Sequence, residues 1–164
     1  MREELDKLLC EKYPKMMVNR NKDMMETCMC WGFACGDGWF NILDQLMGNI
    51  QHHIDWKEKQ HNWAIEWNKE HPDEPRAVPE LVPQVTLDQV KEKFGTLRFY
   101  YTGGDDYISG MVSLAESMTA VTCESCGNPG ERRGGGWVHT YCTPCEEKRE
   151  AERAEYAKQN GFEE

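Results

Sequence analysis

Hydrophobic residues recur three and four positions apart over much of the first half of the chain, a spacing typical of helices with one buried face. Residues 1–11 form the first such stretch, and its apolar stripe consists of Leu5, Leu8 and Leu9. The helix should end before Pro14, because the residue that precedes a proline avoids helical backbone angles. A short polar connection, VNRNKD, follows.

The second stretch runs from Trp39 to Trp67 without a proline, which predicts one long helix, with Gly48 as the place where it could bend. In the sequence CGDGW, Asp37 is the predicted N-cap, and the glycines on either side of it permit a sharp entry into the helix. We therefore expect a helical region over residues 1–71. Four prolines between residues 72 and 83 then exclude a helix or an interior strand and favour an extended linker.

Alternation between apolar and polar positions begins after the prolines, as in a β-hairpin. The apolar positions are Val85 and Leu87 on one arm and Leu97, Phe99 and Tyr101 on the other. Gly95 marks the turn between them. A helix should follow, capped by Asp105 or Asp106. Its predicted apolar face consists of Ile108, Met111, Val112, Ala115 and Met118. Hairpin and helix together occupy residues 84–120.

Four of the eight cysteines lie in the last part of the chain, in the pattern C-x2-C-x15-C-x2-C. They are Cys123, Cys126, Cys142 and Cys145. This spacing is typical of a four-thiolate zinc site, in which both sulfur atoms of each pair reach one ion. Four protein ligands leave no position for a substrate water, so the expected ion is one structural Zn²⁺ per chain. The alternative is a set of four buried free thiols or a redox pair.

The surrounding residues predict a treble-clef-like finger over residues 121–164. Gly127 suits the left-handed residue that closes the first knuckle, and a strand through Trp137 and Val138 should follow a glycine turn. Thr143-Pro144-Cys145-Glu146 reads as a capping box with proline at the first helical position, so a helix should begin inside the second pair and end at Asn160-Gly161. A zinc ribbon is the less favoured arrangement. The complete expectation is an α+β fold.

Composition narrows the classes of function. The formal charge is −10, with 29 acidic against 19 basic residues, which opposes binding to duplex DNA. No stretch is apolar and long enough for a membrane span or an export signal. We therefore expect a soluble protein that remains in the cytoplasm. In such a reducing compartment cysteines remain free or bind metal.

Other polar groups offer weaker candidates. Three cysteines lie close together, and three histidines follow on the long helix; they are Cys28, Cys30, Cys35, His52, His53 and His61. A second metal site is one interpretation of this group, but its spacing matches no standard finger, so we expect core thiols and surface histidines. Cys10 should also be a core residue. Asp105 and Asp106 resemble a metal-binding pair, although helix capping explains them as well.

A basic and aromatic surface is the expected place for a partner. Its residues are Arg98, Tyr101, Arg132, Arg133 and Trp137. Such residues bind phosphates or stack on bases. The alternative is that the arginines offset the charge of the zinc–thiolate site while Trp137 packs on the finger.

Several segments, in this order along the chain, resemble a family of small zinc-finger proteins from tailed phages, prophages and bacteria. They are CGDGWF at residues 35–40, QVKEKFGTLRFYYTGGDDYISG at 89–110, AESM at 115–118, and TCESCGNPG followed by GGWVHTYC. The resemblance covers residues 27–145. Family members often carry Asp-x-His at the last ligand position, whereas this chain has Cys145, which makes its site all-thiolate. The resemblance implies a phage accessory protein in the cytoplasm of a bacterial host cell, but no mechanism.

The functional expectation is a non-enzymatic zinc-containing accessory protein that binds a host protein, in counter-defence or host takeover. A second hypothesis is sequestration of a small nucleotide immune signal by the same arginines and aromatics. A third is a metal-dependent nuclease or hydrolase that uses Asp37, Asp105, Asp106 and the histidines. A fourth is binding of single-stranded nucleic acid, which the acidic charge disfavours.

Overall fold

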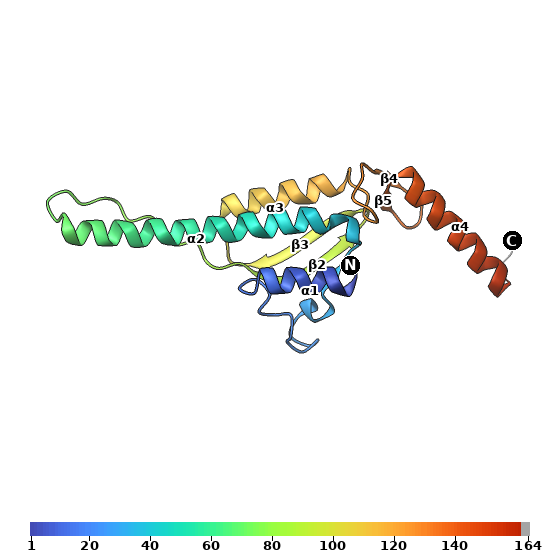
Figure 1. Cartoon of the computed structure of the whole chain (residues 1–164), viewed down its shortest axis with the longest axis horizontal. Helices are drawn as coiled ribbons and strands as arrows, with labels where there is room; N and C mark the ends of the chain where they lie inside the picture. The colour runs from blue at the N-terminus through green and yellow to red at the C-terminus, as the bar shows by residue number, and fades with distance from the viewer. Residues whose placement is uncertain (162–164) are drawn as a thin grey trace.

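A β-hairpin packed against helices forms the body of the molecule in the computed structural model, which describes residues 1–161 (Figure 1). In chain order the elements are α1 (Glu3–Lys12), β1 (Phe33–Ala34), α2 (Phe40–Glu70), β2 (Thr86–Lys93), β3 (Thr96–Thr102), α3 (Asp106–Thr119), β4 (Glu131–Arg133), β5 (His139–Tyr141) and α4 (Thr143–Asn160), with 3-10 turns at Cys28–Trp31 and Asp37–Trp39. The α+β class is confirmed. The four cysteines near the C-terminus belong to a small hairpin and a helix, as expected.

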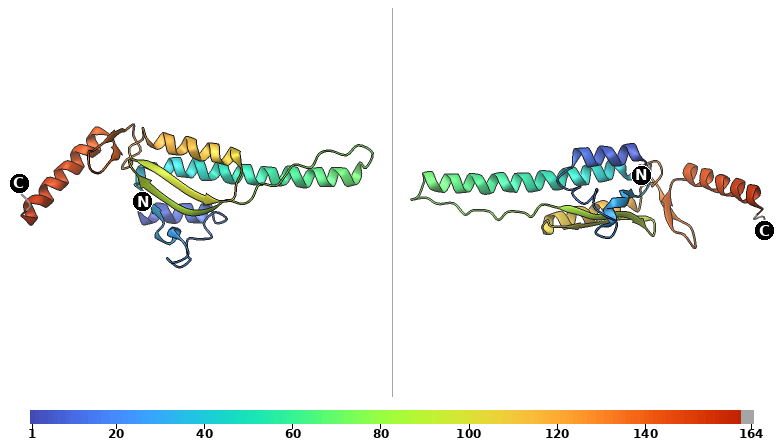
Figure 2. Two further views of the ribbon diagram at one scale, coloured as in Figure 1. Left: turned by 180° about the vertical axis from the view of Figure 1, so that it is seen from behind. Right: turned by 90° about the horizontal axis from the view of Figure 1, so that it is seen from below.

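The molecule is elongated because two helices project from opposite ends of its body. The second half of α2 extends beyond the sheet at one end, and α4 points away at the other (Figures 1 and 2). α4 has no buried residue, whereas the first half of α2 lies in the core. The region predicted as 121–164 includes three terminal residues, 162–164, that lie outside the described part of the chain.

The central sheet has three strands in the order β1-β2-β3. The hairpin formed by β2 and β3 is antiparallel, as predicted, with Val90 opposite Phe99. Its two turn residues, Phe94 and Gly95, both have positive φ (55° and 79°), the geometry of a tight type I′ connection. No pattern of residues indicated the two-residue strand β1, which pairs in parallel with the other edge of β2.

One continuous core lies between the sheet and the helices. Its fully buried members include residues from five parts of the chain: Leu9, Met16, Met29, Trp39, Leu43, Met47, Ile50, Leu87, Val90, Leu97 and Ile108. Tyr13 fixes α1 against α2, because its hydroxyl group donates to the backbone oxygen or the carboxylate of Asp44 at 2.7–2.8 Å. Residues on both sides of the prolines therefore share this core.

The start of α2 differs from the prediction. Asp37 does not cap the helix, since its carboxylate accepts a hydrogen bond from the backbone N–H of Arg2 at 2.8 Å and forms an ion pair with the Arg2 guanidinium at 3.1 Å. A 3-10 turn at Asp37–Trp39 leads into the helix without a side-chain cap. α2 continues through Gly48 as one helix of 31 residues.

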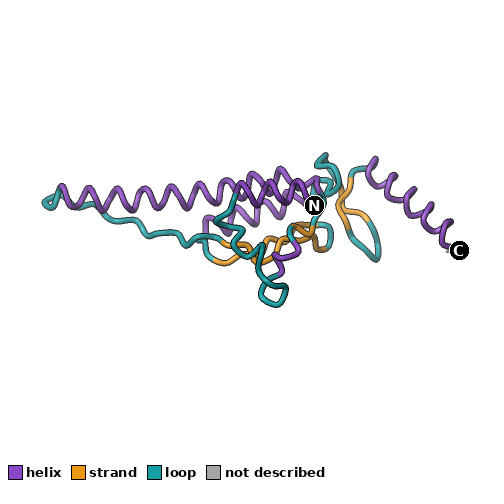
Figure 3. Tube along the Cα trace, turned by 60° about the horizontal axis from the view of Figure 1, so that its bottom comes forward, coloured by secondary structure: helices purple, strands orange, loops and turns teal. Residues whose placement is uncertain are grey.

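The proline-rich residues 72–83 form no helix or strand and run back along the exposed half of α2 (Figure 3). The Nδ1–H group of His61 donates to the carbonyl oxygen of Pro79 at 2.7 Å. Asn68 exchanges two hydrogen bonds with the backbone of Arg76, whose guanidinium lies 4.3 Å from the centre of the Trp67 ring. These contacts hold the segment in place against α2. We refer to residues 55–70 of α2 together with residues 71–82 as the arm.

A buried ion pair organises the segment between α1 and β1. Asp6 accepts hydrogen bonds from the Arg20 guanidinium at 3.1 Å and from the backbone N–H of Phe33 at 2.9 Å. Its side chain is 12% exposed, and that of Arg20 is 30% exposed. Gly32 has φ of 71° and lies so close that a Cβ atom there would overlap the Asp6 carboxylate. Asp6 therefore connects α1, the following loop and the first strand.

Replacing Asp6 with alanine should lower the free energy of unfolding by about 2–4 kcal/mol, because a half-buried guanidinium and a buried N–H would lose their partner. Chemical denaturation measures this change. Glu4→Ala is the matched control on an exposed position of the same helix and should change stability by less than about 0.5 kcal/mol. Equal effects of the two substitutions would contradict the assigned role of Asp6.

Candidate metal centre

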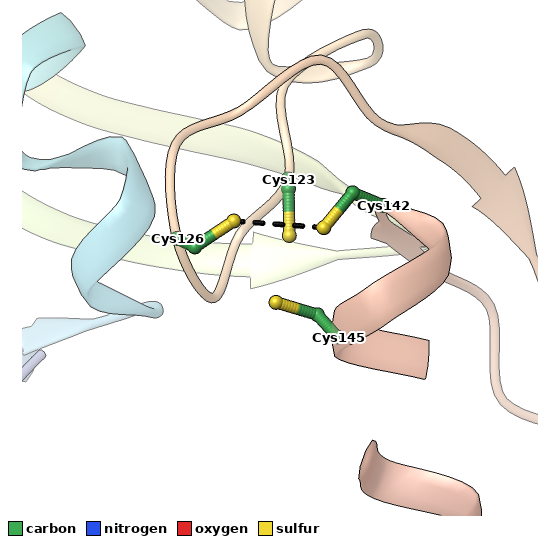
Figure 4. A group of neighbouring side chains, drawn as sticks. All are labelled: Cys123, Cys126, Cys142 and Cys145. Carbon is green, nitrogen blue, oxygen red and sulfur yellow. Dashed lines mark hydrogen bonds between the residues drawn. The ribbon is translucent and has the colours of Figure 1, made fainter. Parts of the chain in front are cut away.

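The side chains of the four cysteines predicted as zinc ligands point toward one another (Figure 4). Their sulfur atoms all lie within 4.8 Å of one another, and the sulfur atoms of Cys126 and Cys142 are 3.6 Å apart. A tetrahedral zinc ion with Zn–S bonds of about 2.3 Å requires sulfur atoms roughly 3.8 Å apart. The cluster is therefore compatible with one structural metal ion held by four thiolates.

The first pair belongs to a tight knuckle. The backbone N–H of Gly127 donates to the carbonyl oxygen of Cys123 at 2.9 Å, and Gly127 has φ of 80°, the left-handed conformation predicted for it. A short bridge between Thr122 and Pro129 closes the loop. Cys123 is fully buried, whereas Cys126 is exposed. The backbone of the knuckle thus presents one sulfur atom from the interior and one from the rim.

The second pair lies at the start of α4. Cys142 is the N-cap residue and Cys145 lies in the first turn, so the helix begins inside the pair, as predicted, and it ends at Gly161 in a left-handed conformation. A hydrogen bond from the backbone N–H of Cys145 is the largest influence on the Cys142 thiol and lowers its pKa to about 7. A thiolate favoured in this way is the form that binds a metal ion.

The predicted capping box is wrong. The hydroxyl of Thr143 lies 2.9 Å from the Arg133 guanidinium instead of capping the helix. Glu146 turns its carboxylate toward His139 Nε2 at 2.6 Å and toward Arg149 at 3.3 Å. The side chains of His139 and Glu146 are 5% and 13% exposed, so this interaction provides a buried polar support beside the cysteines.

The knuckle is attached to the body through the CGDGW segment. The backbone N–H of Gly38 donates to the carbonyl oxygen of Glu124 at 2.7 Å, and the indole N–H of Trp39 donates to that of Thr122 at 2.9 Å. A Cβ atom at Gly38 would overlap the backbone of Cys123 and Gly127. These two backbones therefore approach as closely as glycine allows.

The turn of the main hairpin supplies a second attachment. The hydroxyl of Thr140, a fully buried residue of β5, donates to the carbonyl oxygen of Gly95 at 2.6 Å. Glu124 joins the parts further, since its backbone N–H donates to the Thr140 carbonyl at 2.9 Å and its carboxylate accepts from the Gly36 N–H at 2.8 Å. Desolvation raises the pKa of this carboxyl group. The cysteine cluster is thus continuous with the hairpin and with the start of α2.

The residues predicted to bind a partner lie at several places. Arg98 and Tyr101 are three positions apart on β3 and project from opposite faces of the sheet, and the Tyr101 hydroxyl lies 3.1 Å from that of Ser109 on α3. Arg132 is exposed on β4. Arg133 is held by the Tyr141 carbonyl, Glu131 and Thr143.

Trp137 is not in the strand predicted for it, because β5 begins only at His139. It lies in the glycine turn and is 73% exposed, so it does not pack on the finger. Arg133 and Trp137 line one hollow of about 480 Å³, together with Arg149 and Arg153 of α4. Sequence reasoning missed these two arginines, although their spacing of four residues places them on one helix face.

The other candidate metal residues do not converge. Among residues 1–161 the four-cysteine cluster is the one group of three or more metal-ligating side chains close enough to hold an ion. Cys35 is buried, as expected, and burial raises the pKa of its thiol to about 12. Cys10 and Cys30 are partly buried. The expectation of a core thiol is wrong for Cys28, which is exposed.

The acidic residues of the nuclease hypothesis are also separated. Asp105 caps α3 by accepting from the N–H of Ile108 at 3.0 Å, as predicted, and it contacts His53 at 2.8 Å. Asp37 lies just before the start of α2, about 24 Å from His53 along the helix axis, because the two residues are 16 positions apart.

Among the residues described, no helix is long and apolar enough to cross a membrane.

Substituting Gly38 with alanine should separate the knuckle from the body and reduce stability by about 2–3 kcal/mol, because the added Cβ meets backbone that has little freedom to move. Gly135→Ala is the matched control, since a Cβ atom there meets nothing within 4 Å. Thermal denaturation of both variants measures the difference. A Gly38→Ala protein as stable as the parent would show that the close approach is not required.

Comparison with known proteins identifies no similar protein. No family model, no curated protein sequence and no solved structure matches the chain. The phage-family resemblance therefore remains a prediction, and the conclusion supported by geometry is a four-cysteine metal-binding protein.

Proposed function

We propose that the protein is a non-enzymatic binding protein in which one structural Zn²⁺ joins the C-terminal finger to the body. The observation that carries this proposal is the convergence of four cysteine sulfur atoms within 4.8 Å of one another. Four thiolates fill the coordination sphere of Zn²⁺ and leave no position for a reactive water. The ion then contributes folding energy, of the order of 10–16 kcal/mol in small zinc modules, rather than chemistry.

The biological setting that we propose is that of a phage or prophage accessory protein that binds a host protein. The ordered motifs from CGDGWF to GGWVHTYC support this setting by their resemblance to such proteins. The two projecting helices are consistent with binding, because they expose side chains far from the core: Trp56 and Trp63 on the arm and Tyr156 on α4. Binding by such surfaces needs no catalytic group.

Elemental analysis of the purified protein should give one zinc per chain. Cys142→Ser should lower the zinc content and the melting temperature, whereas Cys28→Ser, which changes an exposed thiol outside the cluster, should preserve both. Removal of the ion by a chelator should lower the melting temperature of the body as well as of the finger, because the knuckle is bonded to Gly38 and Trp39. Two zinc ions per chain, or none, would contradict the proposal.

A second candidate function, sequestration of a small nucleotide, is favoured by the hollow between the glycine turn and α4. Its volume of about 480 Å³ lies within the usual range for small-molecule sites. Trp137 offers an exposed ring for stacking on a base, and Arg153 offers a guanidinium for a phosphate group. The carboxylate of Glu146 within the hollow is already paired with His139 and Arg149.

Thermal-shift measurements with cyclic nucleotides and ADP-ribose derivatives test this candidate. A bound nucleotide at about 100 times its Kd should raise Tm by about 5–10 °C. Trp137→Ala and Arg153→Ala should abolish that shift, while Arg98→Ala, which lies outside the hollow, should retain it. If no nucleotide changes Tm at millimolar concentration, the sequestration hypothesis fails and the protein-binding proposal is unaffected.

A further inference from the structure

An exposed apolar strip runs along the outer side of α3, and it is independent of the metal centre. Its residues are spaced alternately by four and three positions: Tyr107, Met111, Leu114 and Met118 on α3, and Val121 two positions beyond the end of the helix. Four of them are strongly exposed, at 63% for Tyr107, 62% for Leu114, 47% for Met118 and 64% for Val121. This 4-3 spacing is the seam of a helix that packs against another helix. Within residues 1–161, no other helix or strand lies on the outer side of α3 (Figures 1 and 2).

The strip borders a groove between α3 and α2. The groove has a volume of about 330 Å³, and its α2 wall carries Ile42 and Leu46. The polar residues along it, Asn41, Gln45 and Asn49, are uncharged. The groove widens the apolar seam into a shallow surface of the kind that receives a helix.

The order of residues along the strip is nearly the same in both directions. Leu114 is at its centre, the two methionines lie on either side of it, and Tyr107 and Val121 are at its ends. If two copies pack antiparallel about a two-fold axis, Leu114 faces Leu114 of the other copy and Met111 faces Met118. A two-fold interface requires such self-complementarity.

Charge does not oppose a second copy at this strip. The chain has a net charge of −10, so two copies repel each other over most of their surfaces. The strip contains no charged residue, and the two acidic residues of α3 lie apart from it. Asp106 is in the first turn, and Glu116 accepts a hydrogen bond from the backbone N–H of Phe99 at 2.9 Å. The strip and groove therefore offer two copies a contact without like charges.

Gly110 leaves space beside the strip for the approach of a second helix. It lies in the interior of α3, where glycine is less favourable than alanine. A Cβ atom at this position would meet nothing within 4 Å inside the chain, so intramolecular packing does not require glycine. The close approach of a second helix to this side of α3 would explain why position 110 has no side chain.

We propose that the protein forms a two-fold symmetric homodimer in which the strip of α3 packs antiparallel on the same strip of a second copy. One helix of 14 residues is about 21 Å long, so the contact is at the small end of stable interfaces. The dimer should therefore form in the micromolar range and dissociate on dilution. The finger and the arm lie at the two ends of each copy, outside the contact.

Sedimentation equilibrium of the full-length protein tests the proposal. The parent protein should show a concentration-dependent mass that approaches two chains. Leu114→Glu should weaken dimerisation by at least 100-fold, because two carboxylates would face each other at the axis. Leu81→Glu is the matched control on an apolar arm residue of similar exposure (54%) and should leave the dimer unchanged.

A charge-swap pair separates loss of the interface from loss of folding. Leu114→Glu and Leu114→Lys should each be monomeric alone, and an equimolar mixture of the two should recover a dimer. Recovery on mixing excludes misfolding as the cause and places position 114 at the axis. A parent protein that remains monomeric at 200 µM, or a Leu114→Glu protein that dimerises like the parent, would overturn the proposal.

Discussion

The close approach between the backbone at Gly38 and the knuckle of Cys123 is the constraint on which the arrangement of the molecule depends. It joins the start of the longest helix to the first pair of cysteines, 85 positions further along the chain. Hydrogen bonds from the Gly38 N–H and the Trp39 indole fix the distance, and the absence of a side chain at Gly38 permits it. Trp39 is also fully buried in the core, so this one residue contacts both the core and the knuckle that carries the first pair of cysteines.

The cysteine cluster is therefore better described as a junction than as a separate finger. The first pair contacts the start of α2, β5 contacts the turn at Gly95, and the second pair begins α4. The partly buried Glu124 connects the first two of these attachments through its backbone and its carboxylate. A metal ion bound at this junction would couple the orientation of α4 to the integrity of the core.

Local signals in the sequence were sufficient for most of the elements. The 3.6-residue spacing predicted α1, α2 and α3, and the glycine at position 95 predicted the turn. The cap of α3 was narrowed to Asp105 or Asp106, and the structure selects Asp105, whose partner is only three residues away. The failures share a cause. Asp37, Glu146 and Thr143 bind groups that are distant in sequence or in another element, namely Arg2, His139 and Arg133, so tertiary contacts replaced the local caps. Likewise, β1 exists only because β2 lies beside it.

The four clustered cysteines could be identified from their spacing alone. The attachment of the knuckle could not, because in the sequence a glycine required by a distant backbone looks the same as a glycine that permits a turn. The arm illustrates the opposite case, in which contacts stay local. Its two limbs bind mainly each other, through pairs such as Asn68 with Arg76 and His61 with Pro79. Deleting whole helical turns together with the facing residues of the proline segment would shorten the arm without altering the core. Contacts with the core therefore do not constrain the length of this projection, whereas they do constrain the junction at the other end of the molecule.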